Sequence, residues 1–340
     1  MNDNWGLIGH AWAVNMLKHQ IVNTALRHAY LFTGPSGLGR RTLALRFAQA
    51  INCSNPPETG VPCRSCRDCR QIERMQHADL FVLQVEKEAG ALKVEQIREL
   101  QHSLALAAYQ SRFRIALLLH FEEASASAAN ALLKTLEEAP AHVLLMLTAS
   151  DASNLLPTIA SRCEILRLWP IPIESLEKSL LSGGVDPENA RLYAHISGGR
   201  PGYANRLMND PSLLDSRQAC LADLRYLLKA SRIQKFSFAE RMAKDRDQFK
   251  EHLDIWLSCW RDVLLKATHA EVPLTNIDIS EELTTLAGKL EPSNVLQTVE
   301  EHRLALERLD RYVNARLLAE NLLLRLPVVS SPLSGNVSEP

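Results

Sequence analysis

Short apolar runs alternate with amphipathic segments through the first half of the chain. The first run, AYLFT at residues 29–33, is rich in aromatic and β-forming side chains and leads directly into a glycine-rich stretch. A helical pattern follows, in which Leu43, Phe47 and Ile51 recur at every fourth position. This order predicts a strand, a loop and a helix.

Further short apolar runs occur at later positions. The strands that they predict are residues 79–83, 114–119, 142–148 and 163–168. Amphipathic segments such as VEQIRELQHSLAL and SAANALLKTLEEA separate them and predict helices. Strands that alternate with helices, several of them apolar throughout, are typical of a parallel sheet covered on both faces. We therefore expect an α/β domain over residues 1–170.

The second half of the chain has a different pattern. From about residue 171 amphipathic helical patterns replace the strand pattern, and proline-containing sequences at 169–172 and 209–211 mark two boundaries. We predict a small helical domain over residues 171–209 and an all-helical domain over residues 210–327. Residues 328–340 are rich in Ser and Pro and are predicted to be a disordered tail.

Composition narrows the class of protein only in part. The chain has 340 residues, 46% of them hydrophobic and 23% charged, which is typical of a soluble protein with two or three domains. Its net charge of -1 gives no general attraction to nucleic acid, so any DNA contact requires a local basic patch or a partner. The first residues do not resemble a secretion signal, and no apolar run reaches about 18 residues. We expect a cytoplasmic protein with no membrane association.

The stretch GPSGLGRRTLA, residues 34–44, is close to the phosphate-binding pattern G-x-x-x-x-G-K-[ST]. The glycines of the turn are present at Gly34, Gly37 and Gly39. Arg40 replaces the Lys that contacts the β and γ phosphates, and Arg41 replaces the hydroxyl residue that binds Mg²⁺. Thr42 lies one position further, about 100° around the helix, and does not obviously supply that hydroxyl.

Two interpretations of this degenerate loop remain open. The glycines can serve only to make a tight turn, or Arg40 can still bind phosphate, although its planar fork is not equivalent to an ammonium. ATP hydrolysis also needs an acidic residue at the end of a neighbouring strand, whereas RIALLLHFEEA ends its apolar run at Leu119 and His120. Glu122 and Glu123 follow and are expected to be solvated charges at the start of a turn or helix. ATP binding by this loop is therefore doubtful.

The pattern C-x₉-C-x₂-C-x₂-C is formed by Cys53, Cys63, Cys66 and Cys69. Thiolates at this spacing can converge on one tetrahedral Zn²⁺, and four of them leave no open position for catalysis. The pattern predicts a structural zinc module. Nearby Arg64, Arg67 and Arg70 raise the alternative of a zinc-dependent nucleic-acid-binding module, but Asp68 lies among them and the expected patch is modest.

Three segments, HAYLFTGPSGLGR, ANALLKTLEEAP and LLPTIASRC, together resemble the clamp-loader branch of the AAA+ proteins, and the resemblance covers most of the chain. It implies an AAA+ P-loop-type parallel sheet domain with a zinc module at residues 53–69, then a small helical lid domain and an all-α collar domain. It also places Leu119 and His120 at the positions of the two Walker B acids, and Thr148 at the sensor-1 position.

The resemblance further implies a role. It suggests a non-hydrolysing subunit that joins gamma or tau and delta subunits in a hetero-pentamer, whose neighbouring subunits bind ATP while a sliding clamp is loaded on primed DNA. Arg162 in the Ser-Arg-Cys sequence matches an arginine finger that acts on a neighbour's ATP, although by itself it would more often be a surface salt-bridge residue. The alternative is a divergent ATP-hydrolysing subunit of gamma or tau type, in which Arg40 replaces Lys and Glu122 or Glu123 replaces the missing acids.

Overall fold

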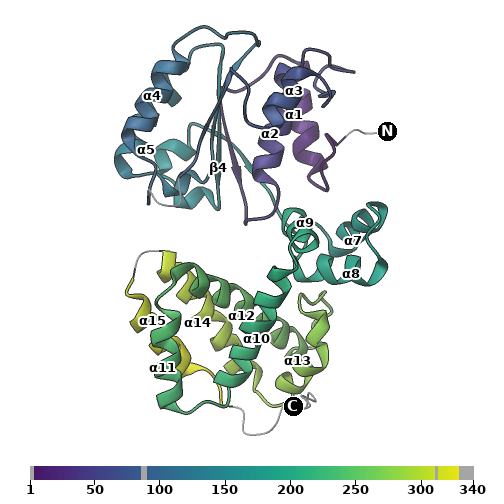
Figure 1. The fold of residues 1–340 in the computed structure, drawn as a ribbon, viewed down its shortest axis with the longest axis vertical. Coiled ribbons are helices and arrows are strands. Elements are labelled where there is room, and N and C mark those ends of the chain that lie inside the picture. The colour runs from purple at the N-terminus through teal and green to yellow at the C-terminus, as the bar shows by residue number, and fades with distance from the viewer. Residues whose placement is uncertain (1–3, 86–89, 311–312, 329–340) are drawn as a thin grey trace. The chain divides into compact units, whose positions relative to one another are not determined.

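The structure, a computed structural model, describes residues 4–85, 90–310 and 313–328. It separates into two compact units (Figure 1). The described residues up to 179 and residues 199–203 form the first unit, and residues 180–198 with the described residues from 204 to 328 form the second. The first unit has a core cluster on each face of its sheet, and the second has a core of its own.

The first unit is built on a five-stranded, all-parallel sheet of order β2-β3-β4-β1-β5. Its strands are β1 (Ala29–Thr33), β2 (Leu80–Leu83), β3 (Arg114–Leu118), β4 (Val143–Ala149) and β5 (Glu164–Arg167). Every predicted strand forms, each within one residue of its expected bounds. The three central strands, β1, β3 and β4, are buried along their whole length, which explains why their sequences are apolar without alternation.

Helices cover both faces of this sheet, as the alternating pattern predicts (Figure 1). One face is covered by α1 (Ala11–Val22) and α2 (Arg40–Asn52), with α3 (Arg67–Glu73) packed on α2. The other face is covered by α4 (Val94–Leu104) and α5 (Ala126–Glu137). The short elements η1 (Phe121–Glu123), η2 (Ala152–Asn154) and α6 (Pro157–Ala160) follow strands β3 and β4.

The second unit contains helices joined by loops, and no strand among its described residues. Its elements are α8 (Pro187–Ile196), α10 (Ser212–Leu227), α11 (Arg232–Met242), α12 (Arg246–Ala267), η3 (Ile277–Ile279), α13 (Ser280–Ala287), α14 (Pro292–Asp310) and α15 (Ala315–Arg325). Two helices, α7 (Ile173–Ser182) and α9 (Pro201–Asn209), begin in the first unit and end in the second. The expected fold class is confirmed: an α/β parallel-sheet domain is followed by a helical part. The finer division at residue 209 stays a prediction.

Two features of the C-terminal part follow from its sequence. The apolar helical pattern over residues 296–326 shows no obvious break, but Asn314 caps a new helix, since its side chain accepts a hydrogen bond from the N–H of Leu317. Helices α14 and α15 are therefore separate.

Except for Val328, the predicted disordered tail lies outside the described residues. None of the described helices is both long enough and apolar enough to span a lipid bilayer.

His302 makes the stability of the second unit depend on pH. Its ring is buried against Trp256 and Trp260, and its Nδ1–H donates to the carbonyl of Thr298 at 2.7 Å. Burial lowers its pKa from 6.5 to about 4. Between pH 6.5 and 4 the unfolded chain therefore binds a proton at this residue that the folded chain does not bind. The free energy of unfolding should fall as the pH drops through this window, by at most about 1.4 kcal/mol per pH unit.

The replacement His302→Gln should flatten this part of the profile. Denaturant unfolding of the full chain across the same pH window measures the effect. A variant whose stability declined as steeply as that of the unchanged chain would show that His302 does not control it.

Candidate metal centre and phosphate loop

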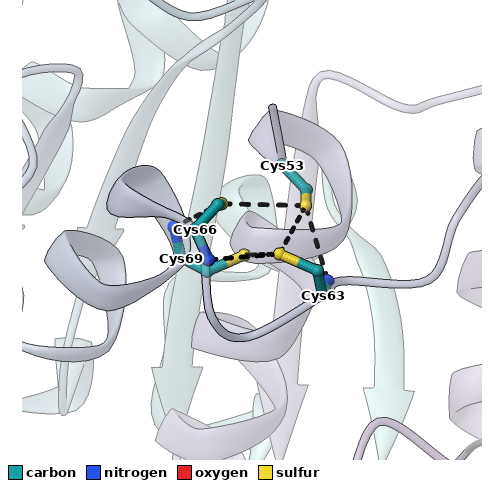
Figure 2. Close-up of side chains that lie close together, drawn as sticks. All are labelled: Cys53, Cys63, Cys66 and Cys69. Atoms are coloured by element: carbon teal, nitrogen blue, oxygen red, sulfur yellow. Dashed lines mark hydrogen bonds between the residues drawn. The ribbon is translucent and has the colours of Figure 1, made fainter. Parts of the chain in front are cut away.

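Four cysteine sulfurs converge beside the C-terminal end of α2 (Figure 2). Cys53 follows the last residue of α2, Cys63 lies in the next loop, and Cys66 and Cys69 belong to the cap and first turn of α3. All four Sγ atoms lie within 4.8 Å of one another, with Cys53 at 3.5 Å from Cys63 and 3.9 Å from Cys66. Tetrahedral coordination with metal–sulfur bonds of about 2.3 Å requires sulfur–sulfur separations of roughly 3.8 Å. The cluster can hold a metal ion.

Backbone groups around the cluster favour thiolates. The N–H groups of Cys63, Cys66 and Cys69 donate to the sulfurs of Cys53, Cys63 and Cys66, respectively, at 3.3–3.4 Å. At Cys63 burial opposes ionisation, but the N–H groups of Cys66 and Ser65, together with the side chains of Ser65 and Cys53, outweigh it and lower the pKa to about 6. At Cys69 burial instead raises the pKa. All four cysteines are free of disulfides, as metal ligands must be.

The cluster is fastened to the sheet domain on two sides. Trp5, wholly buried, donates its indole N–H to the carbonyl of Gly60 at 2.9 Å, in the loop between Cys53 and Cys63. The side-chain amide of Gln49 on α2 donates to the carbonyl of Cys69 at 2.7 Å. Loss of the cluster geometry would therefore disturb the core beneath it.

The glycine-rich loop forms the expected tight turn between β1 and α2. Gly39 caps α2 with φ 92°, and Gly34 and Gly37 also have positive φ, 137° and 85°. A Cβ at Gly34 would lie 2.5 Å from the carbonyl oxygen of Leu168, and one at Gly37 would lie 3.0 Å from the Cβ of Tyr203. These glycines are required by conformation and by close packing.

A later segment of the same unit packs on this loop. The N–H of Gly202 donates to the carbonyl of Gly37 at 2.7 Å, and the backbone of Tyr203 lies against the same glycine. The ring of His10 also forms a hydrogen bond with the carbonyl of Leu38, at 3.0 Å. The loop is therefore held by residues from both ends of the first unit.

Arg40, at the lysine position, is buried, with 7% of its surface exposed. Its Nη1 has no hydrogen-bond partner among the described residues. Burial lowers its pKa, and attraction by Glu122 partly offsets this. Arg41 and Thr42 are exposed. The loop thus presents a single buried guanidinium near its helix terminus and no hydroxyl at the position that binds Mg²⁺ in a working loop.

The end of β3 carries no carboxylate at the positions that the resemblance assigns to Walker B acids. Leu119 is buried, and the backbone N–H of His120 donates to the hydroxyl of Thr148 at 2.9 Å. The expectation that Glu122 is a solvated charge is wrong: its Oε1 accepts from the N–H of Ser150 at 2.9 Å, and its Oε2 is buried. Ser150 directly follows the last residue of β4, so this hydrogen bond holds the carboxylate of Glu122 at the end of that strand.

Arg162 lies just after α6 on the surface of the first unit. Its guanidinium contacts the carboxylate of Glu137 at 2.7 Å and donates to the carbonyl of Thr158 at 2.9 Å. The side chain is 36% exposed. Arg162 is therefore partly accessible and is held by two contacts within its own chain.

Comparison with known proteins decides the family. The protein-family model described as "DNA polymerase III, delta subunit" matches residues 9–172 of the chain. A second family model, described as "DNA polymerase III, delta subunit, C terminal", matches residues 211–327. The chain is 30% identical to DNA polymerase III subunit delta' of Bacillus subtilis over 318 residues, which are 92% of this chain and 94% of that protein. The chain belongs to the DNA polymerase III delta' family.

Other relatives of this delta' family member differ in coverage. It is 34% identical to subunit delta' of Pseudomonas aeruginosa over 59% of this chain and 62% of that protein. It is also 34% identical to subunit tau of Escherichia coli, over 51% of this chain and 26% of that protein. The similarity to tau is thus confined to about half of this chain, whereas that to the Bacillus delta' subunit covers nearly all of it.

Several residues around these sites could not be found from the sequence. Glu137, Gly202 and Tyr203 contact candidate residues that lie 25 or more positions away along the chain, and no motif announces these contacts. Asp79, which precedes β2, has a structural role. Its carboxylate accepts from the N–H groups of residues 109, 110 and 111 at 2.7–3.0 Å, which fixes a loop.

Proposed function

We propose that this delta' family member is the non-hydrolysing subunit of a clamp loader, within the DNA polymerase III holoenzyme in the cytoplasm. It assembles with gamma or tau and delta subunits into a hetero-pentamer that loads a sliding clamp on primed DNA. The observation that carries the proposal is the end of β3, where Leu119 and His120 stand in place of the acids that Mg²⁺ and the attacking water need.

The phosphate loop supports the same conclusion. Arg41 replaces the Mg²⁺-binding hydroxyl, and the packing of Gly202 and Tyr203 on Gly37 crowds the turn. Gly34, Gly39, Arg40 and Thr42 complete a loop that keeps its shape without its catalytic groups. In this proposal the ATP of the complex is bound by the neighbouring subunits.

Arg162 is proposed as the residue that acts on a neighbour's ATP. A guanidinium is always charged, and its fork can stabilise charge on a γ phosphate. The contacts that Arg162 makes with Glu137 and Thr158 are those of a partly exposed surface pair. Such pairs contribute at most about 1 kcal/mol, so a phosphate can replace them at little cost.

For the cysteine cluster we propose Zn²⁺ in a structural role. Four sulfur ligands at tetrahedral spacing suit Zn²⁺, which prefers four-coordinate thiolate sites in this role. Cys53, Cys63, Cys66 and Cys69 would fill every coordination position, so bound Zn²⁺ would hold the loop and α3 in place and bind no substrate.

ATP turnover by the purified chain tests the proposal most directly. We expect none from the chain alone, and turnover when it is mixed with gamma or tau, delta, clamp and primed DNA. The double variant Arg40→Lys with Arg41→Ser restores the loop motif but should remain inactive alone, because β3 still lacks its acids. Mg²⁺-dependent turnover by the unmodified chain alone would contradict the proposal.

That contrary result would support the second candidate, a divergent ATP-hydrolysing subunit of gamma or tau type. The observation in its favour is the buried Oε2 of Glu122, which has no hydrogen-bond partner among the described residues and belongs to a carboxylate whose charge raises the pKa of the buried Arg40. The variant Glu122→Gln separates the two candidates, since it should abolish turnover only if Glu122 replaces a missing acid.

A further inference from the structure

The outer face of the cysteine module carries a concentration of unpaired positive charge. Four arginines, Arg64, Arg67, Arg70 and Arg74, lie within eleven consecutive positions, and all are exposed. Among the residues that the structure describes, none of these four side chains forms a hydrogen bond, pairs with a carboxylate or stacks on an aromatic ring. Many other arginines of the chain have carboxylate partners, such as Arg217 with Asp278.

Two acidic residues that lie next to these arginines in the sequence, Asp68 and Glu73, do not neutralise this face, because each has another partner. The carboxylate of Asp68 lies 3.6 Å from the ring of the buried His77 and is mostly covered. Glu73 pairs with Arg46 and accepts from the side-chain amide of Gln49 at 2.9 Å. The sequence places Asp68 among the arginines, but its carboxylate lies against His77 and pairs with no arginine among the described residues.

A groove gives this charge a defined shape. Arg64, Arg70 and Arg74 line a depression of about 490 Å³ beside the metal cluster, together with the Arg46–Glu73 pair. Its other walls are a cysteine and a serine, so that no aliphatic or aromatic side chain of the described chain lines it. The turn before α3 and the helix itself hold the groove, and the four cysteines fix both.

We propose that this groove binds the phosphate backbone of duplex DNA. Guanidinium forks match phosphate oxygens and form paired, charge-assisted hydrogen bonds with them. A protein partner would ordinarily find an apolar centre in its interface, which this groove lacks. The lack of aromatic side chains likewise removes the stacking platforms by which single strands are bound. Binding is therefore independent of sequence and strongly dependent on salt.

This site is independent of ATP hydrolysis and of Arg162, so it stands or falls separately from the proposed function. The test uses the full chain and a fluorescently labelled duplex of arbitrary sequence, with anisotropy measured over a salt series. Contact of the three unpaired arginines of the groove with three phosphates predicts a slope of log K against log salt of roughly -2.7. The double variant Arg70→Ala with Arg74→Ala should reduce the magnitude of the slope by about 1.8 and weaken binding at low salt by on the order of tenfold or more.

A matched control removes the same charge from the second unit. Arg232 and Arg308 are also exposed, and Arg232→Ala with Arg308→Ala should leave both the affinity and the slope unchanged. Bound metal, measured for every variant, shows that the cysteine module is intact. Equal binding by the Arg70/Arg74 variant and the unchanged chain, or no binding at low salt, would overturn the proposal. So would polyglutamate that displaces the duplex at equal charge concentration, because the groove would then show no preference for phosphate over the carboxylates of an acidic protein segment.

Discussion

Replacement of Arg162 by alanine should reduce ATP turnover at the neighbouring site that it serves by on the order of 10³-fold. The expected cause is loss of the fixed positive charge that stabilises the γ phosphate in the transition state, while ATP binding at that site changes little. Single-turnover hydrolysis in the reconstituted complex, with clamp and primed DNA present, measures this loss. A binding assay with a non-hydrolysable nucleotide separates it from a failure to assemble.

Three variants define the role of this side chain. Arg162→Lys keeps the charge but lacks the fork, so it should restore little activity. Arg167→Ala removes an exposed arginine from nearby β5 and should have no effect. Glu137→Gln breaks the pair that holds Arg162 but leaves the guanidinium in place, so turnover should change far less than in Arg162→Ala. Full stimulated turnover by Arg162→Ala would contradict the assignment of the finger.

Loss of the metal should be the most damaging change to the stability of the first unit. Cys63→Ser removes one of four sulfur ligands and should release the bound ion, since the remaining thiolates no longer close the site. Zinc contributes about 10–16 kcal/mol in small zinc peptides, but this unit also has a sheet core of its own. We expect a loss on the order of 3 kcal/mol, or a fall in Tm of about 6–12 °C.

Metal analysis and thermal unfolding of the full chain check this prediction together. The purified chain should contain zinc in a one-to-one ratio, and Cys63→Ser should contain almost none. Cys163→Ser is the matched control, because Cys163 lies outside the cluster and should leave the zinc content unchanged. A metal-free variant with unchanged unfolding and unchanged resistance to proteolysis within residues 53–69 would contradict a structural role.

The sheet could be predicted closely from the sequence because its burial is extreme. Strands β1, β3 and β4 are covered on both faces, and such strands appear in the sequence as continuous apolar runs between turns. The boundaries of the helices in the second half of the chain were harder to predict. The break before α15 depends on one capping residue, Asn314, within an apolar pattern that continues on both sides. Hydrophobic periodicity alone does not detect such a cap.

The candidate sites were predictable only as far as local spacing determines them. Cys53, Cys63, Cys66 and Cys69 are close in sequence, and their convergence follows from short loops. The partners of the charged side chains were not predictable, because they are residues that the fold brings together from distant parts of the chain. Glu122 is held by the N–H of Ser150, and Asp68 faces His77. These pairings changed the expected solvation of Glu122 and the expected strength of the arginine patch.

The path of the chain around Gly37 limits how this protein can be divided. The first unit includes residues 199–203, which return to it after α8 has passed through the second unit. Within that return, the carbonyl of Gly199 accepts from the N–H of Ile171, and the N–H of Gly202 donates to Gly37. A fragment that ends soon after β5 would leave both the N–H of Ile171 and the carbonyl of Gly37 without these partners. A recombinant sheet domain should therefore extend through α9, even though the strand pattern ends some forty residues earlier.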